Sequence, residues 1–177
     1  MNLKNAYNKA MTYEHYVSRL GENKVLHDLH YNKFELPAHI SQADYLDKTH
    51  KILVITEPWC GDSLALLPIV RKLYECAKNW QFGILLRDEN PTIMDEFLTN
   101  GARAIPIFLF LDQNFDLTVK WGPRPKAAQQ IFEEHREQIQ RGDIKKEEVI
   151  RKIRTFYSKD KGASTISELN QILMIEK

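Results

Sequence analysis

The chain has 177 residues, of which 43% are hydrophobic, enough to bury a core without covalent cross-links. Its 25 basic and 24 acidic side chains give a formal net charge of +1, which argues against nucleic acid or an anionic membrane as a partner. With only two cysteines and no apolar stretch at its start, the sequence does not indicate a disulfide-rich secreted scaffold. We therefore expect a cytoplasmic protein that carries free thiols and has no membrane partner.

The N-terminal part of the chain is predicted to be mostly helical. Apolar side chains with helical spacing begin at Tyr13, with Thr12 as the N-cap and Gly21 as the stop. Residues 22–40 lack a clear period and are predicted to form a connection. A short helical stretch is predicted at 41–48.

The central part of the chain alternates between strands and helices. In chain order, the pattern predicts strand 51–56, helix 60–78, strand 81–86, helix 91–100, strands 106–111 and 117–121, and helix 126–137. Two more helices are predicted at 144–157 and 165–176, the second opened by a capping box of Thr165 and Glu168. This order predicts an α/β fold with a mixed central sheet of about four strands flanked by helices.

Cys60 lies where the first predicted strand gives way to the long helix. The free N–H groups and the dipole at a helix N-terminus favour the thiolate, which is the nucleophilic form of cysteine. Gly61 leaves room for a partner chain to approach, and the hydroxyl of Ser63 can reach the Cys60 sulfur. Most free cysteines are small buried hydrophobic residues, but the exposed corner beside Trp59 favours a functional thiol here.

The segment Trp59-Cys60-Gly61-Asp62-Ser63 resembles the W-C-G-x-C active site of the thioredoxin family, with serine in place of the second cysteine. Residues 101–110 resemble the family's Gly-x-x-x-Ile-Pro-Thr segment, and Gly122 matches a glycine that the family places after the fourth strand. The resemblance implies a single domain, 1–177. Its thioredoxin-like core spans about 48–138, and the helical extensions are 1–47 and 139–177.

The resemblance also implies roles for individual residues. Cys60 and Ser63 occupy the catalytic positions, and Pro106 corresponds to a cis-proline that faces the thiol. The substrate-binding positions implied by the family are Trp59, Gly61, Asp62, Ile105 and Pro106. The implied partners are proteins or low-molecular-weight molecules that carry thiols or disulfides, and we expect no cofactor.

Three departures from the family pattern bear on the chemistry. Ser63 cannot resolve a mixed disulfide, because a hydroxyl is not a disulfide nucleophile at neutral pH. Val54 lies six residues before Cys60, where the family often carries a buried aspartate that helps to deprotonate the second cysteine. Asp62 stands in place of the proline of thioredoxins proper. Its charge, with that of Glu57, opposes a thiolate and should lessen the depression of the Cys60 pKa.

The other candidate residues carry weaker signals. Cys76 follows sixteen residues later on the same predicted helix, about 24 Å away, and is expected to be core-facing or half-buried. His27 and His30 have the spacing of metal ligands, but no cysteine accompanies them and we expect no metal site. Lys145 and Lys146 are followed at once by two glutamates, a mixture typical of a solvated helix face.

Three functions fit these observations. The first is thiol–disulfide exchange through Cys60 alone, with the mixed disulfide resolved by a second thiol from the substrate or from a small thiol such as glutathione or bacillithiol. The second is a redox-inactive module that binds extended peptides or senses thiols. The third is a Cys-to-Ser variant, at Ser63, of a dithiol disulfide reductase.

Overall fold

The computed structural model describes residues 2–48 and 50–175, and its strands form one mixed sheet. Across these residues the strands are β1 (Lys51–Thr56), β2 (Gln81–Leu86), β3 (Ile107–Leu111) and β4 (Leu117–Trp121). The strand order is β2-β1-β3-β4. β1 is parallel to β2 and antiparallel to β3, and β3 is antiparallel to β4, so the predicted mixed α/β sheet is confirmed.

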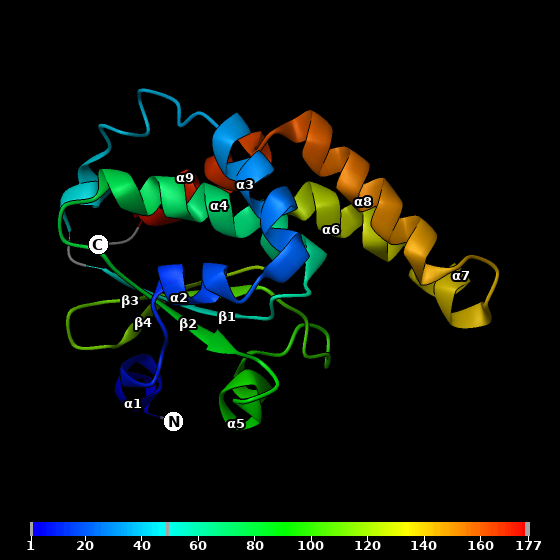
Figure 1. Ribbon diagram of the computed structural model, residues 1–177, viewed down its shortest axis with the longest axis horizontal. Coiled ribbons are helices and arrows are strands. Elements are labelled where there is room, and N and C mark those ends of the chain that lie inside the picture. Colours follow the sequence, from blue (N-terminus) through cyan, green and yellow to red (C-terminus); the bar gives the residue numbers. More distant parts are fainter. Residues whose placement is uncertain (1, 49, 176–177) are drawn as a thin grey trace.

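Helices cover both faces of the sheet (Figure 1). One face carries α1 (Leu3–Asn8) and α5 (Pro91–Met94). The other carries α3 (Lys24–Lys33), α4 (Gly61–Cys76), α6 (Lys126–Glu134), α8 (Lys146–Asp160) and α9 (Ala163–Ile175). The remaining short helical segments are α2 (Tyr13–Ser18), α7 (Arg136–Arg141) and three 3-10 turns, Gly21–Asn23, Asp44–Asp47 and Asp95–Phe97.

β1 is the centre of the hydrophobic core because both of its faces are buried. Ile52 and Val54 pack in the larger hydrophobic cluster, together with the apolar sides of α4 and α9. Leu53 and Ile55 point the other way, into a smaller cluster with α5. A strand fixed from both sides holds the start of α4, and therefore Cys60, in a defined place.

The prediction that residues 22–40 form a connection is wrong, because α3 occupies much of that segment. Its apolar residues Val25 and Leu29 are exposed, so the sequence lacks the apolar stripe that marks most packed helices. α3 packs against α4 instead, and its buried residue is His27. Because the buried residue is polar, the hydrophobic periodicity that predicts a packed helix is missing from this segment.

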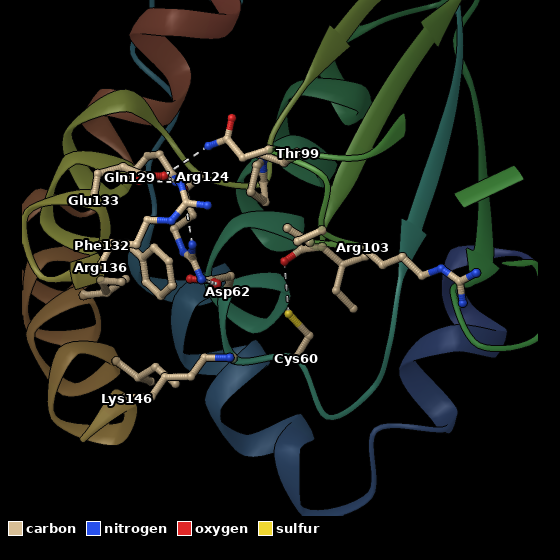
Figure 2. Close-up of a pocket in the computed structure, with 18 of the residues that line it drawn as sticks. Cys60, Asp62, Thr99, Arg103, Arg124, Gln129, Phe132, Glu133, Arg136 and Lys146 are labelled. Atoms are coloured by element: carbon tan, nitrogen blue, oxygen red, sulfur yellow. Dashed lines mark hydrogen bonds and ion pairs between the residues drawn. The ribbon is translucent and has the colours of Figure 1, made fainter. Parts of the chain in front are cut away.

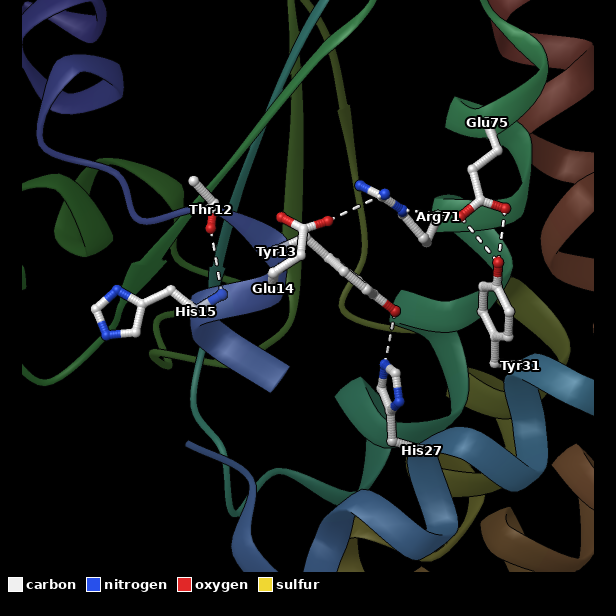
Figure 3. A network of polar contacts seen from close by, with 8 residues as sticks. All are labelled: Thr12, Tyr13, Glu14, His15, His27, Tyr31, Arg71 and Glu75. Carbon is white, nitrogen blue, oxygen red and sulfur yellow. Dashed lines mark hydrogen bonds and ion pairs between the residues drawn. The ribbon is translucent and has the colours of Figure 1, made fainter. Parts of the chain in front are cut away.

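Polar contacts attach the N-terminal segment to α4 (Figure 3). Tyr13 and His27 share a buried hydrogen bond of 2.6 Å between the tyrosine hydroxyl and Nε2. Arg71 of α4 pairs with Glu14 at 3.2 Å and with Glu75 at 3.0 Å. His27 is thus engaged in packing, and the described residues contain no cluster of three or more side chains suited to a metal.

Several helix boundaries differ from the predictions: α2 ends at Ser18 rather than at Gly21, and the helix predicted at 126–137 is divided between α6 and α7. The helix expected at 91–100 is only α5 followed by a 3-10 turn. The capping box at Thr165 is wrong, because α9 already begins at Ala163. Glu168 instead accepts hydrogen bonds from Trp121 Nε1 and the Lys126 backbone N–H, at 3.0 and 2.7 Å, which ties α9 to β4 and α6. No helix among the described residues is both long and apolar enough to span a bilayer.

Candidate functional site

Cys60 is the N-cap residue of α4, just beyond the carboxyl end of β1. Its backbone N–H donates to the Glu57 carbonyl at 3.1 Å, and its own carbonyl accepts from the Leu64 N–H at 3.1 Å, which begins the helix. Cys60 Sγ lies 3.4 Å from the Ile105 carbonyl oxygen (Figure 2). The fold therefore brings together the two segments that carry the sequence motifs.

The segment facing the thiol has a fixed backbone. The peptide bond between Ile105 and Pro106 is cis, as is the bond between Gly122 and Pro123. Gly122 has φ +113°, and a Cβ added there would lie 2.4 Å from the Pro106 carbonyl oxygen. Only glycine allows this approach, so the loop after β4 holds the Pro106 segment against Cys60.

The Cys60 side chain is only 7% exposed, so the expected exposed corner is wrong. Burial raises the pKa of the Cys60 thiol, and the Asp62 carboxylate raises it further. Hydrogen bonds from Ser63 and from the first backbone N–H groups of α4 act the other way. Burial outweighs them, so the predicted depression of the pKa is also wrong, and the protonated thiol is the dominant form at neutral pH.

Asp62 is held in an ion pair rather than pointing freely to solvent. Its carboxylate lies 2.6 Å from Arg124 Nη2 and accepts a hydrogen bond of 2.8 Å from the Tyr157 hydroxyl of α8. The side chains of the ion pair are 13% and 14% exposed. Glu57, the other carboxylate expected to oppose the thiolate, instead accepts from the Asp88 N–H at 2.8 Å.

No partner thiol stands one helical turn beyond Cys60. Ser63 is buried, and its hydroxyl is hydrogen-bonded to the hydroxyl of Thr56. Val54 is fully buried in β1. Cys76, the second cysteine of the chain, lies in the last turn of α4 and is exposed, which corrects the expectation of a buried or half-buried thiol.

A cavity of about 470 Å³ opens beside Cys60 (Figure 2). Its wall is formed by the start of α4, the loop before β3, α6 and α8. Of the predicted site residues it is lined by Trp59, Cys60, Gly61, Asp62 and Ile105. Ser63 and Pro106 are buried behind this surface rather than lining it.

Trp59 and Gly61 each lie beside a basic side chain that the active-site motif did not predict. Trp59 is 56% exposed, and the Arg87 guanidinium lies 4.8 Å from the centre of its ring. The space beside Gly61, expected to admit a partner chain, faces Arg154 of α8, whose Nη2 lies 3.4 Å from where a Cβ on Gly61 would be. Lys146 also lines the cavity, so it does not belong to a purely solvated helix face.

Comparison with known proteins places this site in a family. A family model described as Thioredoxin matches residues 10–140. The chain belongs to the thioredoxin family. Thioredoxin H7 from Arabidopsis thaliana is 30% identical over 95 residues, which make up 52% of this chain and 71% of that protein. The family membership indicates thiol–disulfide redox chemistry.

Two solved structures share the thioredoxin-like fold. One is a Pseudomonas aeruginosa protein of unknown function, with TM-score 0.63, 19% identity and coverage of 89% of this chain and 95% of that one. The other is an HIV epitope scaffold, with TM-score 0.64, 19% identity and coverage of 73% and 81%. At this level of identity the likeness concerns the fold alone.

The sequence reasoning missed the contacts that the thioredoxin-family site makes with the loop after β4 and with α8. Arg124, Tyr157, Lys146 and Arg154 all lie beside Asp62 or line the cavity. Arg124 had a detectable signal, since it lies two residues after Gly122, which matches a glycine of the family. The α8 residues had none, because nothing in the sequence says where an appended helix will pack.

Proposed function

We propose that this thioredoxin-family protein catalyses thiol–disulfide exchange through Cys60 alone. The observation that carries the proposal is the pairing of a thiol at the start of α4, next to the Ile105–Pro106 segment, with a buried serine at the resolving position. Cys76 cannot take over that role within the folded chain, because it lies at the other end of a sixteen-residue helix, about 24 Å away.

The exchange then has two steps. The Cys60 thiolate attacks one sulfur of a disulfide R–S–S–R′, forming Cys60–S–S–R and releasing R′–S⁻, which takes up the proton that Cys60 lost. An external thiolate R″–S⁻ attacks the R sulfur, forming R–S–S–R″ and returning the electron pair to Cys60 Sγ. The raised pKa of Cys60 slows both steps, because less thiolate is present for the first attack and a thiolate of higher pKa leaves more slowly in the second.

A second function is favoured by one observation, the burial of Cys60. A thiol that is 7% exposed and has a raised pKa suits a peptide-binding module in which Cys60 reacts slowly or not at all, rather than a thiol sensor, whose cysteine is accessible and has a low pKa. The third reading, a Cys-to-Ser variant, is less well supported, because the Ser63 hydroxyl has a hydroxyl partner in Thr56. Val54 also leaves no acid–base helper for a thiol at position 63.

The test is adduct formation with a small disulfide. The protein is incubated with glutathione disulfide and its intact mass is measured, in parallel with Cys60→Ser and Cys76→Ser variants. We expect one glutathione adduct on Cys76→Ser, in which Cys60 is the sole cysteine, whereas an adduct on Cys60→Ser reports the exposed Cys76. The absence of any adduct on Cys60 would favour the peptide-binding module.

A further inference from the structure

α8 lies outside the span matched by the thioredoxin family model, yet it forms one wall of the Cys60 cavity. Lys146, Ile150 and Arg154 follow each other at intervals of four residues, so they share one face of the helix. All three line the cavity. An element added to the family core has therefore supplied part of the active-site surface.

The cavity wall is rich in positive charge. Its charged lining residues are six basic and two acidic side chains: Arg87, Arg103, Arg124, Arg136, Lys146 and Arg154, against Asp62 and Glu133. Four of the basic side chains have a carboxylate partner: Arg87 with Asp88, Arg103 with Asp95, Arg124 with Asp62 and Arg136 with Glu133. The excess of positive charge is therefore concentrated in the remaining two.

Lys146 and Arg154 are the two cationic side chains of this wall that form no ion pair or hydrogen bond with other described residues. Both are exposed, so they can meet a ligand without first breaking an internal contact. Figure 2 shows Lys146 extending from α8 toward Asp62 and Cys60, whereas Arg103 extends away from the thiol. The Arg154 guanidinium faces Gly61, the residue next to Cys60.

We propose that α8 makes this cavity a binding site for small thiols that carry carboxylates, and for their disulfides. The proposal rests on the proposed function, since such a thiol would be the external partner that resolves the Cys60 adduct. Its carboxylates would pair with Lys146 and Arg154 while its sulfur reaches Cys60 Sγ. The volume of about 470 Å³ lies in the range of small-molecule sites, which is about 300–1,000 Å³.

The size and burial of the site favour a small ligand over a folded protein. Cys60 is nearly covered, and α6 and α8 pack together on one side of it. Phe132 and Ile150 add apolar surface to the cavity wall between the charged groups. A flexible thiol of a few residues can enter such a cavity, whereas a protein disulfide must be presented on a protruding segment.

Binding can be tested without exchange by using S-methylglutathione, a thioether that carries the carboxylates but cannot form a disulfide. The titration follows the backbone amide NMR signals of the native chain. Two variants are compared, Lys146→Glu with Arg154→Glu, and a matched control, Lys145→Glu with Arg151→Glu. The control makes the same charge change at the N-cap of α8 and on α8 itself, at exposed positions that do not line the cavity.

We expect saturable shifts at residues 60–62 and on the cavity face of α8 in the native chain and in the control. In the Lys146/Arg154 variant we expect binding weaker by about tenfold or more. Measurement at physiological ionic strength screens charges beyond about 8 Å, so the control should differ little from the native chain. No saturable shift in the native chain, or equal weakening in both variants, would overturn the proposal.

Exchange kinetics separate this proposal from the proposed function. Adduct formation on Cys60 is timed with glutathione disulfide and with neutral hydroxyethyl disulfide. We expect the Lys146/Arg154 variant to slow only the first reaction, by about tenfold. Equal rates in that variant and the control, with both disulfides, would overturn the α8 site while leaving exchange intact. Saturable S-methylglutathione binding without an adduct from either disulfide would retain the anion site and refute exchange.

Discussion

The two ends of α4 carry the two cysteines of the chain in opposite environments. At the N-terminal end, Cys60 is buried, receives hydrogen bonds from the helix start and faces a cis-proline segment. At the C-terminal end, Cys76 is exposed in the last turn. Accessibility favours Cys76 as the thiol that reagents reach first. The helix N-terminus and the facing backbone favour Cys60 as the functional thiol.

Exposure alone therefore does not identify the functional thiol, because the surroundings of each sulfur also decide what chemistry it can do. Burial and a neighbouring carboxylate raise the pKa of Cys60, and burial and Glu75 raise that of Cys76. Neither environment therefore stabilises the thiolate enough to lower the pKa of its cysteine. Cys60 differs in having a cavity that can hold a substrate beside its sulfur.

The largest change is expected when the N-terminal end of α4 is given a second thiol. Ser63→Cys places a thiol one helical turn beyond Cys60, at a separation that a disulfide can bridge. We expect a reversible disulfide between Cys60 and the new thiol, and dithiol reductase activity that rises from none, because the adduct can then be resolved internally. Thiol titration of the oxidised protein and an insulin reduction assay measure the two effects.

Ser63→Ala is the matched control, since it also removes the hydrogen bond with Thr56 but adds no thiol. Both variants should lose about 1 kcal/mol of unfolding free energy from that bond. A folded Ser63→Cys protein that never forms the disulfide under oxidising conditions would contradict the thioredoxin-like geometry assigned to the start of α4.

The comparison predicts a second large contrast, in labelling by a bulky maleimide. Cys76 should react faster than Cys60 by about tenfold or more, because Cys60 is nearly inaccessible in the folded chain. In denaturant the two rates should become similar. Peptide mass spectrometry after limited labelling measures the ratio, and faster labelling of Cys60 in the native state would show that the cavity opens more than the structure indicates.

A smaller effect is expected from Asp62→Asn. The change removes a negative charge that raises the Cys60 pKa, and it frees the Arg124 cation to stabilise the thiolate. Both effects lower the pKa of Cys60, so iodoacetamide should alkylate Cys60 severalfold faster at neutral pH. In the native chain the rate should still be rising with pH beyond the ordinary range of a cysteine thiol.

Glu57→Gln is the control for this pKa experiment. It removes a carboxylate from the same loop, but that carboxylate accepts a hydrogen bond from the Asp88 N–H. The pH profile of Cys60 alkylation should therefore change little in Glu57→Gln. If both variants shift the profile equally, the effect of Asp62 is one of net charge and not of its position beside Cys60.

Much of the fold could be predicted from local patterns. The β-branched apolar run at 51–56 is a strand with the predicted bounds, since a short buried strand carries a dense apolar signal. The segment 117–121 also has the predicted bounds, although only Val119 and Trp121 are buried there. α3 could not be predicted in the same way, because its buried side chain is a histidine that bonds to Tyr13. Its packing depends on a tertiary contact that local sequence does not encode.

The candidate site likewise has a part that local motifs predict and a part that depends on tertiary packing. Cys60, Asp62 and Ile105 follow from two motifs and do meet at one place in the structure. The burial of Cys60, and with it the direction of its pKa shift, depends on segments remote in sequence. Tyr157 and Lys146 reach the site from α8, whose position follows from packing against α6 rather than from any local pattern.

The central claim is that Cys60 acts alone and needs an external thiol to complete the exchange. It is tested most directly on the Cys76→Ser variant, in which Cys60 is the sole cysteine. The glutathione adduct of Cys60 is isolated, and its loss is followed by intact mass with and without added glutathione. We predict that the adduct persists without thiol and is released at a rate proportional to the thiol concentration. Release at the same rate without thiol would contradict the account.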